Sequence, residues 1–183
     1  RLIEIDAMGC RDTIINTLNV DSLPIVQYTI DTVCLGDSTT FTNASRGANG
    51  KTIATNYWKF GDGTTSDTNA ISFKHSYSAD STYWRSVLIL TDNGGCVDSS
   101  VVDVKVRPLP IPNYSAPDVC LFDSTYFTDL STIKSTGGAI TNWDWTFEVG
   151  QTSTLQNPTY LFPTSGNFET VKLIVNDEFA CKD

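Results

Sequence analysis

The 183-residue sequence contains only one histidine, His75, and no Cys-x-x-Cys pair. Zinc-ligand spacings are therefore absent. The sequence also lacks the nucleophile signatures of acyl-transfer enzymes and the glycine-rich loops that bind phosphates. With no catalytic constellation present, His75 is interpreted as a packed strand residue in preference to a catalytic one. The sequence therefore predicts a protein that is not an enzyme.

Positive charge and long apolar runs are also scarce. The sequence has 12 Lys and Arg residues and 21 Asp and Glu residues, which gives a net charge of −9 and a pI near 4.4. Nucleic-acid phosphates would repel such a surface, so no nucleic-acid partner is expected. No run approaches the roughly 20 apolar residues of a membrane helix, so no membrane span is expected in this segment. There is no signal peptide pattern, and Arg1 opens directly on strand-like sequence, which predicts a fragment of a longer protein.

Hydrophobic residues, in contrast, make up 40% of the sequence and aromatic residues 11%, enough to form buried cores. Trp58 and Phe60 stand two residues apart and so share one face of an extended strand. Asp62-Gly63 then closes that strand, because both residue types tolerate the positive φ of a tight turn. Trp145 and Phe147 repeat the aromatic pair, so the chain holds more than one copy of a unit.

The cysteines define the period of that repetition. The five cysteines lack metal-site spacing, which favours disulfides and an oxidising, extracellular setting. Turns that carry Cys10, Cys96 and Cys181 follow one another at intervals of 86 and 85 residues, with Gly before the first two cysteines and Ala before the third. Val-Cys-x-x-Asp-Ser segments at Cys34 and Cys120 have the same spacing. Self-similarity at a fixed period indicates a tandem array.

The register of the repeats sets the expected boundaries. Residues 1–22 are predicted to be the last two strands of one repeat, 23–108 a complete repeat, and 109–183 a repeat without its last strand. The joints at residues 21–24 and 107–112 are short and proline-rich, which favours a stiff connection.

Short strands separated by turn residues fill the complete repeat, and no stretch has helical periodicity. This pattern predicts an all-β fold of tandem immunoglobulin-like Greek-key β-sandwiches. The expected strands, A, B, C, E, F and G in order, are Ile25–Ile30, Ser38–Asn43, Thr52–Phe60, Ala70–Tyr77, Tyr83–Thr91 and Cys96–Val106.

Three motifs of the complete repeat carry a family resemblance. Trp58-Lys59-Phe60-Gly61-Asp62-Gly63, His75-Ser76-Tyr77 and Val87-Leu88-Ile89-Leu90-Thr91-Asp92 resemble the PKD (polycystic kidney disease) domain in order and spacing. The third repeat departs from this pattern, with Glu148-Val149-Gly150 at the turn and Asn157-Pro158-Thr159-Tyr160 at the second motif, but Gly166-Asn167-Phe168 keeps it. The cysteine motifs further resemble repeat arrays of Bacteroidota surface proteins exported by the type IX system, including SprB-like gliding-motility adhesins.

The resemblance implies a non-enzymatic spacer rod on a bacterial cell surface, in a parent that mediates adhesion or gliding. Its expected partners are neighbouring repeats of the same chain and other cell-surface or secretion-system proteins. The alternative is an accessory module of a secreted polysaccharide- or protein-degrading enzyme. Many flanking repeats would favour the adhesin, whereas an adjoining catalytic domain would favour the enzyme.

Several residues allow both a functional and a purely structural interpretation. No cofactor is expected, although Asp62 in its Gly-Asp-Gly turn is a candidate calcium ligand; simple turn chemistry is the favoured reading. The aspartates that recur after strand F, Asp6, Asp92 and Asp177, are likewise read as turn residues. Strand packing at the sandwich rim is favoured for Trp84 and Trp143 over carbohydrate or interface contacts.

The Bacteroidota resemblance also implies O-glycosylation at Asp-Ser/Thr followed by an apolar residue or Thr. The acceptors of the six matching motifs are Thr13, Ser22, Thr32, Ser38, Ser81 and Ser124.

Two cysteine pairings compete. The simpler one joins cysteines within a repeat, Cys34 with Cys96 and Cys120 with Cys181. In the strand directions that the family resemblance implies, however, Cys34 and Cys96 lie at opposite ends of a sandwich, whereas bridged Cα atoms lie within about 7 Å. The A–B loop faces the F–G turn of the next repeat instead, so the favoured bridge joins Cys34 to Cys181 across the joint. Cys10, Cys96 and Cys120 would then pair with repeats outside this segment.

Overall fold

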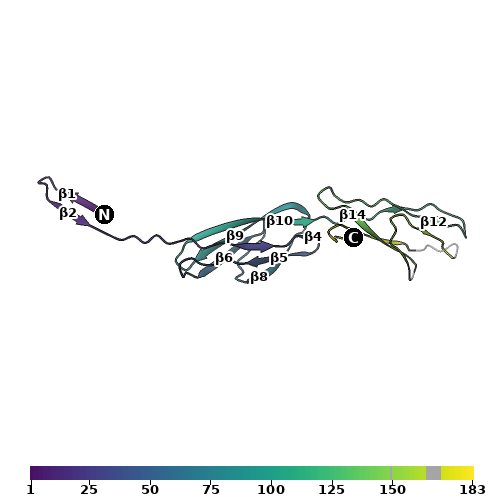
Figure 1. The fold of residues 1–183 in the computed structure, drawn as a ribbon, viewed down its shortest axis with the longest axis horizontal. Coiled ribbons are helices and arrows are strands. Elements are labelled where there is room, and N and C mark those ends of the chain that lie inside the picture. Colours follow the sequence, from purple (N-terminus) through teal and green to yellow (C-terminus); the bar gives the residue numbers. More distant parts are fainter. Residues whose placement is uncertain (149, 164–169) are drawn as a thin grey trace.

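The computed structural model describes residues 1–148, 150–163 and 170–183, without the side chains of residues 81, 82 and 148. Every regular element within these residues is a β-strand, and none is a helix. A hairpin and two β-sandwiches follow one another in a row, which makes the molecule elongated (Figure 1). The all-β, tandem-sandwich prediction is confirmed.

The N-terminal hairpin pairs β1 (Leu2–Ile5) with β2 (Arg11–Ile14) in antiparallel register. All of its residues are exposed, including large apolar ones such as Ile5 and Ile14. An extended segment, residues 15–24, leads from the hairpin to the first sandwich.

The first sandwich consists of two sheets. One has three strands in the order β3-β5-β8, and the other has five in the order β4-β10-β9-β6-β7. The strands are β3 Tyr28–Ile30, β4 Val33–Cys34, β5 Ser38–Asn43, β6 Ile53–Lys59, β7 Thr65–Ser66, β8 Ser72–Ser76, β9 Ser81–Asp92 and β10 Val97–Arg107.

The strand predictions match this order closely, with β5 having the expected bounds. The main correction concerns strand A, which was expected as one strand over residues 25–30. Only residues 28–30 of that range form a strand, β3, which pairs antiparallel with β5. Residues 33 and 34, expected in the A–B loop, instead form β4, which crosses to the other sheet and pairs parallel with β10. Val33 is opposite Val106, and Cys34 is opposite Arg107. Cys34 therefore lies where the chain leaves the first sandwich.

The core of the first sandwich is built around Trp58, which is fully buried. Its indole makes edge-on contacts with Tyr28 and Phe73, at centroid distances of 5.0 and 5.1 Å. Leu88 and Leu90 of β9 are also fully buried and alternate with half-buried neighbours, as the two faces of a strand require. The predicted aromatic core strand thus lies at the centre of the molecule's larger hydrophobic cluster.

The turn after this strand differs from the expected one. Positive φ falls on the two glycines, Gly61 (φ 91°) and Gly63 (φ 92°), and Asp62 is not among the positive-φ residues. A Cβ at Gly61 would lie 2.7 Å from the carbonyl oxygen of Arg85, so that position also needs glycine for space.

The second sandwich has shorter strands around a second aromatic core. Its described strands are β11 Tyr114–Ser115, β12 Thr125–Tyr126, β13 Thr128–Asp129, β14 Ile140–Glu148, β15 Gln151–Ser153, β16 Thr159–Tyr160 and β17 Lys172–Asp177. Trp145 and Phe147 of β14 are buried against Phe127, Leu173 and Val175. Val149, the Gly166–Phe168 part of the family pattern, and Glu169 lie outside the described residues. The C-terminus lies beside the joint between the sandwiches (Figure 1).

Candidate functional site: the joint between the sandwiches

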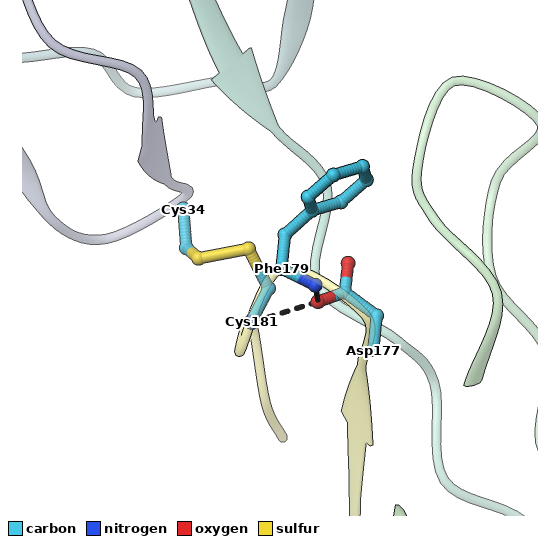
Figure 2. The surroundings of a disulfide bond; sticks show 4 residues. All are labelled: Cys34, Asp177, Phe179 and Cys181. Carbon is cyan, nitrogen blue, oxygen red and sulfur yellow. Dashed lines mark hydrogen bonds between the residues drawn. A yellow bond between two sulfur atoms is a disulfide. The ribbon is translucent and has the colours of Figure 1, made fainter. Parts of the chain in front are cut away.

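A disulfide joins the two sandwiches. Cys34 of β4 is bonded to Cys181, which follows β17, with an S–S distance of 1.98 Å and a Cα–Cα distance of 5.5 Å (Figure 2). This is the cross-repeat pairing favoured above, and the within-repeat pairs Cys34–Cys96 and Cys120–Cys181 are not formed. Cys34 and Cys96 cannot bridge because they lie at opposite ends of β10. Cys96 directly precedes the first residue of that strand, whereas Cys34 is paired with its last residue, Arg107. An 11-residue strand is about 35 Å long, far beyond disulfide reach.

A tight turn presents Cys181 to its partner. Asp177, which is buried, accepts hydrogen bonds through Oδ1 from the backbone N–H groups of Phe179 (2.9 Å) and Cys181 (2.8 Å) (Figure 2). The Asp177 N–H donates in turn to the Cys181 carbonyl oxygen at 2.9 Å. A carboxylate holding two amides of its own turn fixes the direction in which Cys181 points.

The same turn recurs in the other two repeats. Asp6 accepts from the N–H of Cys10, and Asp92 from the N–H of Cys96, both at 2.9 Å. These hydrogen bonds agree with the interpretation of the three aspartates as turn residues.

Three cysteines of the chain are unbridged: Cys10 and Cys120 are exposed, and Cys96 is half-buried. Cys120 occupies the same kind of turn as Cys34, because its carbonyl oxygen accepts from Asp123 N at 3.0 Å, as that of Cys34 accepts from Asp37 N. The turn that holds Cys34 and the turn that holds Cys181 thus each recur along the chain.

Noncovalent contacts also join the two sandwiches. The guanidinium of Arg107 lies over the Phe179 ring, 3.3 Å from its centroid, and a cation–π contact of this kind stabilises by roughly 0.5–2 kcal/mol. Lys134 of the second sandwich pairs with Asp80 of the first at 2.6 Å. Lys134 is largely exposed, so this pair adds little.

These contacts were not predicted from the sequence. In the preceding repeat, Asp21 occupies the position of Arg107 and Gly94 occupies the position of Phe179. Because neither residue type recurs, a comparison of the repeats does not predict the Arg107–Phe179 contact. Pro108 and Pro110 are both buried. Their packing agrees with the stiff joint expected from the proline content.

Asp62 and His75 form a second polar cluster, in the first sandwich. Asp62 accepts from Thr64 N (2.9 Å) and Thr64 Oγ1 (2.6 Å), and its other oxygen lies 2.8 Å from His75 Nε2. Burial raises the pKa of Asp62, but hydrogen bonds from Thr64 and His75 outweigh it and hold the pKa below its ordinary value. His75 stacks on Phe60 at 3.9 Å, in line with a packed strand residue. The observed bonds are those of a closed turn.

Trp84 and Trp143 are both half-buried. Trp84 stacks on Tyr77 with centroids 5.5 Å apart, and Trp143 donates through Nε1 to Asp129 Oδ2 at 2.7 Å. Both contacts agree with the interpretation that these tryptophans pack at the rim of their sandwiches.

Among the residues that the structure describes, no group of three or more His, Cys, Asp or Glu could hold a metal ion. Within the same residues, no helix has the length and apolar character needed to span a membrane.

Repeated immunoglobulin-like sandwiches, joined end to end by a short proline segment and a disulfide, define a class of multidomain β-sandwich chain. The PKD domain family matches residues 21–106 and 109–183, which is most of the sequence. The chain therefore belongs to the PKD domain family, whose members are commonly extracellular structural or accessory modules and typically non-catalytic.

Similar solved structures include the PKD1 domain of Vibrio anguillarum Epp, at 21% identity and a TM-score of 0.40, over 48% of this chain and 99% of that one. The PKD1 domain of the Vibrio cholerae metalloprotease PrtV has 25% identity and a TM-score of 0.41, over 46% and 98%. The fibronectin(III)-like modules of Clostridium thermocellum CbhA have 16% identity and a TM-score of 0.38, over 85% and 88%. No curated protein matches the chain.

Proposed function

We propose that this chain is a spacer segment of a long bacterial cell-surface repeat protein, an adhesin or gliding filament resembling the SprB-like arrays. The observation that carries the proposal is the covalent bridge across the joint. A bridge between Cys34 and Cys181 restrains bending between neighbouring sandwiches, which a rod needs and an isolated binding module does not. An extracellular location also suits the bridge, because disulfides persist in oxidising compartments.

The repetition of the turn geometry supports extension of the rod beyond two sandwiches. Cys96 and Cys120 are held in the same turns as the two bridged cysteines. In a longer array, Cys96 would pair with the A–B loop of the preceding repeat, and Cys120 with the F–G turn of the following one. Neighbouring repeats are thus the principal partners in this proposal.

Immunogold electron microscopy of intact cells tests the surface role. An antibody against this chain is expected to label the cell surface, with gold particles set away from the envelope, and to give no label on a strain lacking the gene. Recovery of the antigen in the culture medium, on a protein with co-purifying hydrolase activity, would instead support the accessory-module alternative.

Glycosylation is a further part of the proposal and rests on the Bacteroidota resemblance. Thr13, Ser22, Thr32 and Ser124 are exposed, as acceptors must be, whereas the Ser38 hydroxyl is half-buried and lies 2.8 Å from that of Ser76. The Ser81 side chain lies outside the described part of the chain. Intact mass spectrometry of the natively purified protein should show added hexose masses, and an unmodified mass would end this part of the proposal.

A further inference from the structure

The disulfide changes how the two termini are covalently connected. Cys34 and Cys181 are separated by 147 residues in sequence, yet their Cα atoms lie 5.5 Å apart. The shortest covalent route through the molecule follows residues 1–34, crosses the bridge and continues through residues 181–183. Residues 35–180 form a closed loop beside that route.

Both hydrophobic cores depend on this loop. Every strand from β5 to β17 lies within it, and so do the central tryptophans Trp58 and Trp145. Unfolding of either core would therefore release chain only inside a closed loop. It would add no length between the termini.

The part of the route that crosses the first sandwich is already extended. β3 and β4 are strands, each paired to a neighbour in a different sheet. Pro24 and Tyr28 are buried and anchor the beginning of this segment. Because a strand is close to the full length of its chain, detaching it under tension also adds little.

We infer that the Cys34–Cys181 bridge carries tension past both sandwiches, so that the segment is nearly inextensible while oxidised. Reduction opens the loop, and unfolding then lengthens the chain by about 500 Å, which is 147 residues at roughly 3.4 Å each. The inference concerns this chain whichever parent carries it, and so goes beyond the proposed spacer role.

Release of the loop is a two-electron thiol–disulfide exchange. One thiolate of a dithiol attacks a bridge sulfur and forms a mixed disulfide, and its second thiol then closes the reductant into its own disulfide. Cys34 and Cys181 each leave as a thiol with one added proton. Cys181 is almost fully buried and Cys34 is half-buried, so attack is expected at the Cys34 sulfur.

Single-molecule force spectroscopy on the full chain, with peptide-tag handles at both termini, tests the inference. Cys10, Cys96 and Cys120 are replaced by Ser in every molecule, so that no other thiol exchanges with the bridge. The oxidised chain is expected to show only the opening of the N-terminal hairpin, a step of at most about 50 Å. Adding dithiothreitol to the same molecule under load should then release steps that sum to about 500 Å.

The matched control adds Cys34→Ser to the same background. It should extend without reductant and show no response to dithiothreitol. If this variant does not fold, reduction of the bridged molecule in place provides the same comparison. Unfolding steps of hundreds of ångströms in an oxidised molecule would overturn the inference. That result bears only on the bridge, and a failed cell-surface labelling experiment bears only on the proposed function.

Discussion

Removal of the bridge should destabilise the sandwich that unfolds first. The perturbation is Cys34→Ser with Cys181→Ser. Suppose that the second sandwich unfolds while the first stays folded. Its chain is then a loop closed at both ends, because Cys34 is held next to Arg107 by β4–β10 pairing and by the 2.8 Å bond from Leu35 N to the Arg107 carbonyl oxygen. That loop runs from Arg107 to Cys181, about 74 residues, and closing it lowers unfolded-state entropy by an amount equivalent to about 4.4 kcal/mol.

The same loop arithmetic predicts coupling between the sandwiches. With both unfolded, the loop has 147 residues and its closure corresponds to about 5 kcal/mol. Nearly all of the stabilisation therefore opposes the first unfolding step, and only about 0.6 kcal/mol opposes the second. The bridged chain should unfold almost as one unit. The double-Ser chain should unfold in separate transitions, the weaker of them lower in Tm by roughly 20–30 °C.

Hydrogen exchange followed by mass spectrometry in increasing urea measures this coupling, because peptides from β9 and β17 report the two sandwiches separately. Replacing Cys10 and Cys120 by Ser is the matched control, since it removes two exposed thiols and leaves the bridge. Independent transitions in the bridged chain, with midpoints unchanged by the double-Ser substitution, would refute the loop-closure reasoning.

Three further predictions concern single residues. Residues 23–108 alone should fold as an all-β domain, and Trp58→Ala should destabilise it by about 3–5 kcal/mol, because Trp58 is fully buried; a melting shift of only a degree or two would contradict this. Asp62→Asn should lower the unfolding free energy at pH 7 by about 1–2 kcal/mol. Since the folded-state pKa of Asp62 lies below its ordinary 3.8, the contribution is present above pH 4 and is lost as pH falls through the folded pKa; urea unfolding should show the difference shrinking at pH 3, and a constant difference would argue against it. Asp177→Ala should destabilise the second sandwich by about 1–3 kcal/mol, with Asp177→Asn milder because its amide oxygen can accept the same two bonds; equal thermal shifts for both variants would count against the turn's role.

The fold was largely predictable because its signals are local. Aromatic pairs, period-2 alternation and turn residues mark β5, β6, β9 and β10 within a few positions of their observed ends. The crossing of strand A was not predictable, because β4 has only two residues and so shows no alternation. Its parallel pairing with β10 depends on contacts more than 70 positions apart.

At the joint, only the residues that belong to recurring sequence motifs were predictable. Cys34 and Cys181 belong to motifs that recur along the sequence, so the register and the family's strand directions together place them face to face. Arg107 and Phe179 have no counterparts in the other copies. Their stacking depends on how one sandwich sits on the next, which no local pattern contains.

Non-reducing tryptic peptide mapping of the natively purified protein tests the central claim most directly, because each of the five cysteines falls on a different tryptic peptide. The cross-joint bridge predicts a reducible species in which residues 12–46 are linked to residues 173–182. A species linking residues 12–46 to residues 86–105, the peptide that carries Cys96, would contradict it.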